Sequence, residues 1–424
     1  DVVTGVADVG TTPSLSADDA VAAAAAHLRG NVRATRAAEL MLHVADGATH
    51  LVWRTRVSRI DPVVESWEVL VDAHDGSVVR AQSRTYNVDG TGTVFKPDPL
   101  SSARVAYTTP GYGDNGNADS PQFTAQLFPV TLRDITLSGG QYRLEGPYAS
   151  CRELETPTDA ACPTGASADF SVTRNALTFD AVNVYYHLDT YLRYVNVTLG
   201  VTAMPTMYFS GGVRFDAHAR DGDDNSAYSD GELYFGEGGV DDAQDADVVI
   251  HELGHGIHDW ITNGGLSNVQ GLSEGTGDYL AQGYSRDFPN QWTSADAQYH
   301  WMFSFDGHNT DWNGRVTNWH IGHSYPNNLG SVYHLQGQYW ASCNMVARDA
   351  LGGALMDKAF LVGLSMTTGT SNQKAAAQAV INAAAAQGWT GAQIAQLAAA
   401  YNTSCNYAVT VPAASDVIFS NGFQ

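Results

Sequence analysis

Positive charge is scarce in this sequence. The 424 residues include 22 Lys and Arg against 45 Asp and Glu, which gives a formal net charge of −23. Binding to phosphate backbones requires a basic face, so this balance argues against a nucleic-acid partner. Long hydrophobic runs are also missing, because no stretch reaches the roughly 18 apolar residues that a membrane-spanning helix needs. We therefore expect no membrane span.

Cysteine is rare, and the four that occur are Cys151, Cys162, Cys343 and Cys405. Four cysteines allow three pairings. The short Pro- and Gly-containing loop between the first two favours a local disulfide, which leaves the last two as the second pair. Four free buried thiols are the alternative for a cytosolic protein. The chain begins at Asp1, which fits either a processed secreted protein or trimming. We expect a secreted protein, exported through the periplasm in a Gram-negative host.

The length exceeds what one hydrophobic core normally serves, so two or three folding units are expected. Residues 1–85 combine a helix capped by Ser16 with alternating strand patterns and the hairpin turn Asp75-Gly76, which indicates a small α/β domain. Residues 86–102 are rich in Gly, Pro and Asp and suit either a linker or the first strand of the next unit. We expect maturation cleavage within Arg80–Ser102.

The rest of the chain changes once from strand patterns to helical patterns. Residues 103–250 carry mostly strand and turn patterns, whereas residues 251–412 are mainly helical. The fold class expected is therefore α+β, with a β-rich N-terminal half, a helical C-terminal half and a tail at residues 413–424. We expect a monomer.

The stretch "VVIHELGHGIHDW" holds two histidines four residues apart. On a helix such residues share a face, so His251 and His255 can bind one ion while Glu252 faces its bound water. A helix with merely exposed histidines is the alternative. The apolar "ADVVI" before His251 speaks against it, as do the two helix-weakening glycines Gly254 and Gly256.

A third ligand is available in "GLSEGTGDYLAQG". Eighteen residues separate His255 from Glu274, enough to turn and bring a second helix back past the first. Asp278 lies four residues further, on the same face, where it can accept the free N–H of a ligand histidine. A solvated carboxylate is the alternative for Glu274 alone. The pattern favours a Zn²⁺ site formed by His251, His255 and Glu274.

These residues resemble the gluzincin metallopeptidases, the group of thermolysin and the fungalysins, and the fungalysin type is the closer match. The resemblance rests on "DVVIHELGHGIHDW" and "SEGTGD". It extends to "FDAVNVYYHLDTYLRYV", "NSAYSDGELYFGEGG" and "YHLQGQYWASCNMVARDALG", and "WEVLVDAHDGSVV" is similar to the end of a propeptide. It thus covers nearly the whole chain. It implies a thermolysin-like catalytic unit around a central zinc helix, preceded by a propeptide that acts as chaperone and inhibitor.

The resemblance also implies residue roles. Glu252 is the general base, Asp278 orients a ligand histidine, and His334 stabilises the oxyanion from across the cleft. Asn225 and Ala227 correspond to contacts with the substrate backbone, although "NSAY" departs from the family's "NA" pattern. The shorter spacing to Glu274 and the small residues that follow it depart from fungalysins, which leaves the subfamily and the substrate preference open.

Two further expectations concern the surroundings of the zinc site. Arg315, in the aromatic stretch Phe303–Asn327, is a candidate contact to the substrate backbone. Asp221, Asp223 and Asp224 cluster in the sequence and are candidates for Ca²⁺. Asp247 is a further candidate, because the resemblance implies a calcium-binding aspartate four residues before the first zinc histidine. A solvated acidic loop is the alternative, because the pattern of an EF-hand is absent.

The function expected is that of a secreted zinc-dependent endopeptidase acting on peptides or proteins. Two alternatives stay open: a zinc aminopeptidase, which the eighteen-residue spacing also suits although the amine-anchoring G-x-M-E-N motif is missing, and a catalytically silent binding protein on a peptidase scaffold.

Overall fold

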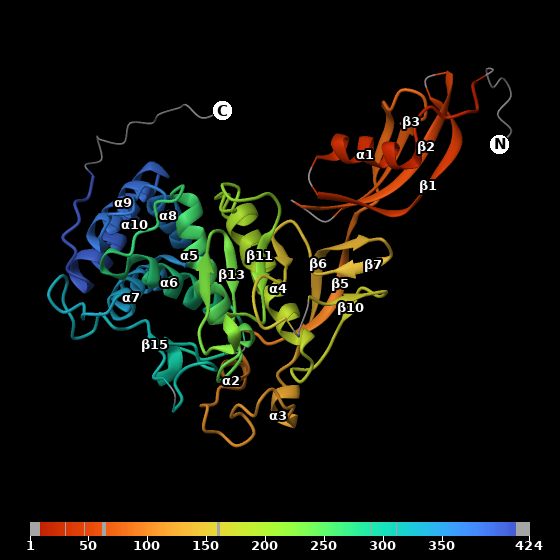
Figure 1. Ribbon diagram of the computed structural model, residues 1–424. Coiled ribbons are helices and arrows are strands. Elements are labelled where there is room, and N and C mark those ends of the chain that lie inside the picture. The colour runs from red at the N-terminus through yellow and green to blue at the C-terminus, as the bar shows by residue number, and fades with distance from the viewer. Residues whose placement is uncertain are drawn as a thin grey trace.

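The computed structural model describes residues 9–29, 31–45, 47–61, 65–158, 162–289, 291–310 and 312–412. The tail expected at residues 413–424 lies outside this described part. Figure 1 shows a smaller N-terminal lobe beside a larger body in which strands come first and helices follow. The expected α+β class is confirmed, with the strands concentrated in the N-terminal half of the larger body and the helices in its C-terminal half.

The N-terminal lobe consists of one helix on a four-stranded antiparallel sheet of order β1-β2-β3-β4. Its elements are α1 (Ala17–Leu28), β1 (Asn31–Ala45), β2 (Ala48–Asp61), β3 (Glu65–Asp72) and β4 (Val78–Ser83). Ser16 caps α1, and its hydroxyl accepts a hydrogen bond from the backbone N–H of Asp19. The buried face of the helix, formed by Ala20, Ala24 and Leu28, packs on valines of β2 and β3.

Residues 86–94 form strand β5 (Tyr86–Val94), which is the first-strand alternative rather than a linker. β5 pairs antiparallel with β6 (Phe128–Ser138), from Tyr86 opposite Leu137 to Val94 opposite Phe128. The sheet has the order β10-β5-β6-β7-β9, so β5 lies inside it and not at an edge. The remaining part of the expected linker enters the short helix α2 (Pro99–Ala103), which Asp98 caps.

The body contains two further sheets, of order β12-β13-β11-β8 and β14-β15, followed by a group of helices. Its other strands are β7 (Gln141–Arg143), β8 (Ala149–Cys151), β9 (Thr164–Gly165), β10 (Asp169–Phe170), β11 (Val213–Asp216), β12 (Ala227–Ser229), β13 (Glu232–Tyr234), β14 (Trp301–Met302) and β15 (Arg315–Val316). Its other helices are α3 (Pro121–Thr124), α4 (Thr178–Arg193), α5 (Ala246–Ile261), α6 (Leu272–Arg286), α7 (Tyr333–Leu351), α8 (Gly353–Leu364), α9 (Gln373–Ala386) and α10 (Gly391–Ala399). The helix α5 crosses the boundary expected after residue 250.

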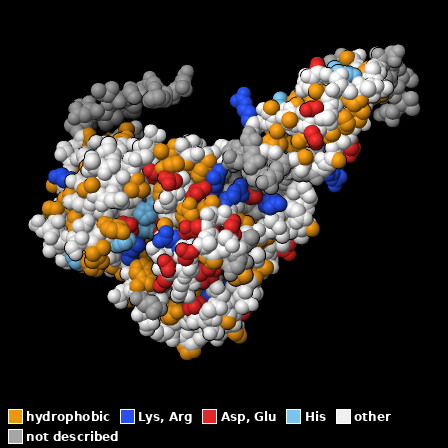
Figure 2. All heavy atoms as spheres, viewed as in Figure 1, with side chains coloured by type: hydrophobic (Ala, Val, Ile, Leu, Met, Phe, Trp, Pro, Cys, Tyr) orange, Lys and Arg blue, Asp and Glu red, His pale blue; other side chains and the backbone are white. Residues whose placement is uncertain are grey.

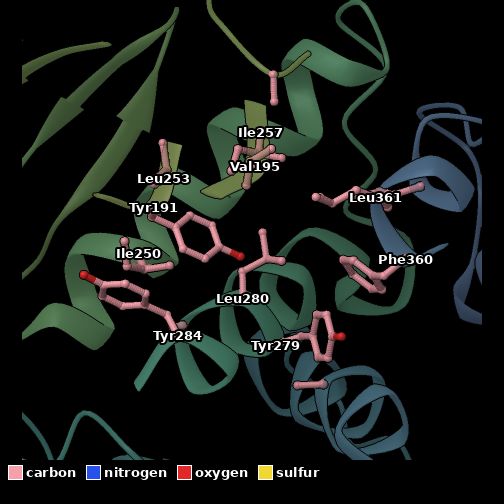
Figure 3. Packing of buried hydrophobic residues seen from close by; sticks show 14 of the residues in the cluster. Tyr191, Val195, Ile250, Leu253, Ile257, Tyr279, Leu280, Tyr284, Phe360 and Leu361 are labelled. Carbon is pink, nitrogen blue, oxygen red and sulfur yellow. The ribbon is translucent and has the colours of Figure 1, made fainter. Parts of the chain in front are cut away.

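The main core lies where α4, α5, α6 and α8 meet (Figure 3). Ile250, Leu253 and Ile257 project from one face of α5 at helical spacing, and all three are fully buried. Leu280 and Tyr284 of α6 lie beside them in the same cluster. α5 is thus held on its apolar face, which fixes the direction of the opposite face that carries the histidines.

Both expected disulfides are present. Cys151 is bonded to Cys162, and Cys343 is bonded to Cys405. The second bond ties α7 to the end of the helical region, 62 residues later in the chain. Among the described residues, no helix combines the length and the apolar character that crossing a bilayer demands.

Candidate metal centre

The two histidines of the H-E-x-x-H stretch lie on one face of α5. Asp245 caps the helix by accepting a hydrogen bond from the backbone N–H of Asp247. One turn of helix brings the Nε2 atoms of His251 and His255 to within 3.2 Å of each other. Two acceptor nitrogens at that distance, largely removed from solvent, form half of a tetrahedral metal site.

Helix α6 supplies the third group. The Glu274 carboxylate lies 3.5 Å from Nε2 of His251 and 3.7 Å from Nε2 of His255. Ligands at the Zn–N and Zn–O distances of about 2.0–2.2 Å in a tetrahedral site are about 3.4 Å apart. Oε2 of Glu274 approaches His251 and its Oε1 approaches His255, so the two imidazole nitrogens and this carboxylate surround a space that fits a zinc ion. The donor set of two imidazoles and one carboxylate leaves the fourth position open for water.

Glycines allow the three helices around the site to approach one another closely. A Cβ on Gly254 of α5 would lie 2.6 Å from Cα of Gly277 in α6, and a Cβ on Gly275 would lie 2.2 Å from the carbonyl oxygen of Gly337 in α7. Neither distance is compatible with a side chain. Gly254 has no room for a side chain because α6 packs directly against it.

Each ligand histidine has a partner for its other ring nitrogen. Nδ1 of His251 lies 2.9 Å from Oδ1 of Asp278, as expected from the sequence. Nδ1 of His255 lies 2.7 Å from the hydroxyl of Ser273, which sequence reasoning missed. Such partners orient the ring and set its tautomer. The available signal for Ser273 was its position immediately before the third ligand.

Arg315 of β15 was expected to contact the substrate backbone. In the structure its guanidinium bonds to two carboxylates of the metal site. Nη1 lies 3.1 Å from Oε2 of Glu274 and 2.8 Å from Oδ1 of Asp278. It also lines the cavity next to the histidines. Arg315 therefore holds two carboxylates of the site in place, and any contact with a substrate would come in addition.

Burial shifts the pKa of Glu252 and of His255 in opposite directions. It raises the pKa of Glu252 to about 7, with a further contribution from the nearby Glu274 carboxylate. It lowers the pKa of His255 to about 4, which favours the neutral imidazole that a metal requires. Against burial, the hydrogen bond to His251 and the charges of His255 and Arg315 hold the pKa of Glu274 well below its usual range. Glu274 is therefore ionised and Glu252 can exchange a proton near neutral pH.

A cavity of about 400 Å³ opens in front of the site. Figure 2 shows Asp and Glu side chains gathered beside a group of histidines on this face of the body. Glu252, His334 and Asn225 line the cavity, whereas Ala227 begins the neighbouring strand β12 and is not among the lining residues. His334 is 44% exposed, and its Nε2 lies 3.5 Å from Oε2 of Glu274.

The four aspartates expected to bind Ca²⁺ are not brought together. Asp221 and Asp223 are exposed, and the Asp221 carboxylate accepts a hydrogen bond from Thr156. Asp247 is buried and accepts hydrogen bonds from the Ser285 hydroxyl and the backbone N–H of Phe303. Within the described part of the chain, Asp224 alone of the four joins a group of carboxylates whose oxygens lie close enough together to hold a metal ion, with Asp242 and Asp306.

Residues 128–259 match the family model described as "Thermolysin metallopeptidase, catalytic domain". The matched segment includes His251, Glu252 and His255 and ends before Glu274, which the structure adds to the site. The chain matches no curated protein. The match does not separate the fungalysin type from other thermolysin-like peptidases. Together with the geometry of the site, this match supports a thermolysin-like zinc metallopeptidase, a hydrolase that cleaves peptide bonds.

Proposed function

We propose that the protein is a secreted zinc-dependent endopeptidase. The observation that carries the endopeptidase assignment is the edge strand β12, which is the first strand of its sheet and adjoins Asn225 and Ser226 in the cavity wall. An extended peptide can add to such an edge through main-chain hydrogen bonds and pass across Glu252. This mode of binding requires no free chain terminus.

The residues divide the chemistry between them. His251, His255 and Glu274 would hold the zinc ion, and a zinc ion lowers the pKa of bound water and polarises the scissile carbonyl. Glu252 takes the proton of the attacking water and passes it to the leaving amine, a task suited to a carboxylate whose pKa lies near neutrality. Asp278 and Ser273 keep the two imidazoles in the orientation that the metal needs.

His334 is proposed to donate a hydrogen bond to the developing oxyanion. Burial lowers its pKa, so the ring is neutral at pH 7 and retains one N–H for this purpose. Replacing His334 by Gln is expected to lower kcat about 100-fold with little change in KM, because the bond strengthens only in the transition state. Steady-state kinetics on a fluorogenic peptide measure this effect. His323→Gln, at a partly exposed position of the larger body outside the cavity lining, is the control, and an unchanged kcat in H334Q would remove His334 from the mechanism.

The proposed function is tested by zinc content together with hydrolysis of casein and of peptides blocked at both ends. One zinc ion per chain and cleavage of the blocked peptides, both lost with a chelator, are the expected results. Cleavage restricted to peptides with a free amino terminus would indicate an aminopeptidase. Zinc binding without any hydrolysis would indicate a silent binding protein.

The N-terminal lobe is proposed to be a propeptide that acts as a folding chaperone. It adjoins the catalytic sheet, where the hydroxyls of Ser66 in β3 and Ser138 in β6 lie 2.6 Å apart. The described residues that line the cavity include none from this lobe. The arrangement therefore supports assistance in folding more directly than inhibition of the cleft. The disulfides support secretion, because such bonds persist in oxidising compartments.

Maturation cleavage is expected next to Arg84 and Thr85. Within the window Arg80–Ser102, these two residues lie between β4 and β5, and the Arg84 side chain is exposed. Cleavage inside β5 would break a strand that is paired on both sides. N-terminal sequencing of the secreted protein should place the mature end within a few residues of Thr85. A mature end at Asp1 or beyond Val94 would contradict this expectation.

A further inference from the structure

A second group of carboxylates lies in the same cavity as the zinc site. Asp224, Asp242 and Asp306 each contribute an oxygen to a cluster in which these atoms lie within 4.8 Å of one another. All three residues line the cavity that Glu252 and His251 also line. A substrate that reaches the catalytic glutamate therefore passes these carboxylates.

The cluster is held in a defined position by the main chain around it. The backbone N–H of Asp306 donates to Oδ2 of Asp245, and its carbonyl oxygen accepts a hydrogen bond from the indole of Trp312. On the other side, the loop that contains Gly238 packs so closely on Asp224 that a Cβ at Gly238 would lie 2.4 Å from its backbone nitrogen. The side chain of Asp242 accepts a hydrogen bond of 2.5 Å from the hydroxyl of Ser226.

The cluster contains a buried carboxylate oxygen without a hydrogen-bond partner in the described structure. Asp306 is 7% exposed, and in the described structure its Oδ1 has no hydrogen-bond donor. Burial and the neighbouring Asp242 carboxylate raise the pKa of Asp306 well above its usual range, and a cation placed beside it would offset this shift by stabilising the ionised carboxylate. Arg315 is the one Lys or Arg among the described residues that line the cavity, and its guanidinium is bonded to Glu274 and Asp278.

We propose that Asp224, Asp242 and Asp306 form a specificity pocket for the cationic side chain of a lysine or arginine next to the scissile bond of the substrate. This inference rests on the proposed endopeptidase function. Val248 and Trp312 line the same cavity and offer apolar surface to the methylene groups of such a side chain. The charged end then reaches the Asp306 carboxylate, whose Oδ1 has no hydrogen-bond donor in the described structure.

A basic side chain fits this site better than a bound metal ion. The site opens into the substrate cavity, and Asp224 is exposed, so its walls face the path of the peptide. A calcium ion takes six to eight oxygen ligands, many more than three carboxylates supply as single donors. Binding of a metal ion by the three carboxylates is included as a separate outcome of the experiment.

The test compares two peptides that differ by one charge. Both are blocked at both ends, and one carries lysine and the other norleucine next to the cleaved bond. For the zinc-loaded full chain, kcat/KM is expected to be about 100-fold higher for the lysine peptide, the range that buried charge pairs produce. A library of blocked peptides then shows on which side of the cleaved bond the basic residue lies.

Three variants test whether the preference for the lysine peptide arises from the three carboxylates. D306N, D242N and D224N should each lower the ratio of the two kcat/KM values by about 10-fold or more, because each removes one carboxylate from the pocket. Asp224 is exposed, so D224N keeps the proposal testable if the buried variants do not fold. The matched control is Asp223→Asn, which removes the same charge one residue away and outside the cavity lining, and which should keep the wild-type ratio.

The outcomes are separable. Equal cleavage of the lysine and norleucine peptides overturns the specificity pocket and leaves the endopeptidase intact. A chain that holds zinc and cleaves neither peptide overturns the endopeptidase function. Terbium or calcium binding that D306N abolishes and D223N retains, together with equal cleavage of the two peptides, assigns the cluster to a metal ion and overturns the proposal.

Discussion

Replacement of Glu252 by glutamine is expected to leave zinc bound and to lower kcat on a peptide substrate by about 10³-fold, within the range that general acid–base catalysis supplies. Glutamine has nearly the same shape, so the cavity and the helix should be preserved. It cannot accept a proton from water at neutral pH. The three groups expected to hold the metal, His251, His255 and Glu274, are unchanged in this variant.

Zinc content, thermal unfolding and single-turnover cleavage should be measured on the same preparation of E252Q. Zinc at the wild-type level with activity lost assigns the loss to proton transfer. Glu153→Gln is the matched control, because Glu153 is an exposed residue of the larger body that does not line the cavity. Wild-type turnover in E252Q would remove Glu252 from the role of general base. Loss of zinc in E252Q would instead make Glu252 a contributor to metal binding.

The zinc site could be predicted from the sequence because its geometry is local. The spacing of His251 and His255 is a property of any α-helix, and the structure places both residues on α5. Glu274 required one assumption, that the chain turns back between the two helices. The structure places its carboxylate at ligand distance from both histidines.

The acidic pocket could not be predicted in the same way because its three members come from distant segments. Asp224 precedes β12, Asp242 precedes α5, and Asp306 follows β14. The sequence grouped Asp224 with Asp221 and Asp223 by proximity along the chain. The turn of the backbone at this loop separates them, and tertiary packing supplies the partners instead. The bonds between Arg315 and the carboxylates of α6 could not be predicted either, because these residues are also distant in the sequence.

The glycines of strand β5 are ambiguous in the sequence. Its glycines suggested a linker, yet they are required by packing. A Cβ at Gly90 would lie 2.5 Å from the carbonyl oxygen of Ala168, and one at Gly92 would lie 2.8 Å from Cγ1 of Val182. Glycine marks flexible loops and close contacts alike, and the sequence alone does not distinguish the two. The neighbour that makes glycine necessary is visible only in the fold.

The same ambiguity applies to the glycines of α6, and it can be tested at Gly277. A Cβ at this position would lie 2.6 Å from Nδ1 of His251 and 2.7 Å from its carbonyl oxygen. G277A should therefore displace the His251 imidazole or push α6 away from α5. Either movement separates His251 from Asp278 and Glu274, and loss of such orienting contacts typically weakens zinc binding about 10- to 100-fold.

Zinc affinity of G277A, measured by competition with a chelator, should fall by about 100-fold, at the upper end of that range because the displaced residue is itself a ligand. Peptidase activity at limiting zinc should fall in parallel and recover in part when excess zinc is added. The control is Gly391→Ala in α10, where nothing lies within 4 Å of the added Cβ, so that affinity and activity should stay at the wild-type level. If G277A kept the affinity of the wild type, α5 and α6 could separate without disturbing the metal ligands, and the close approach of the two helices would have no part in forming the site.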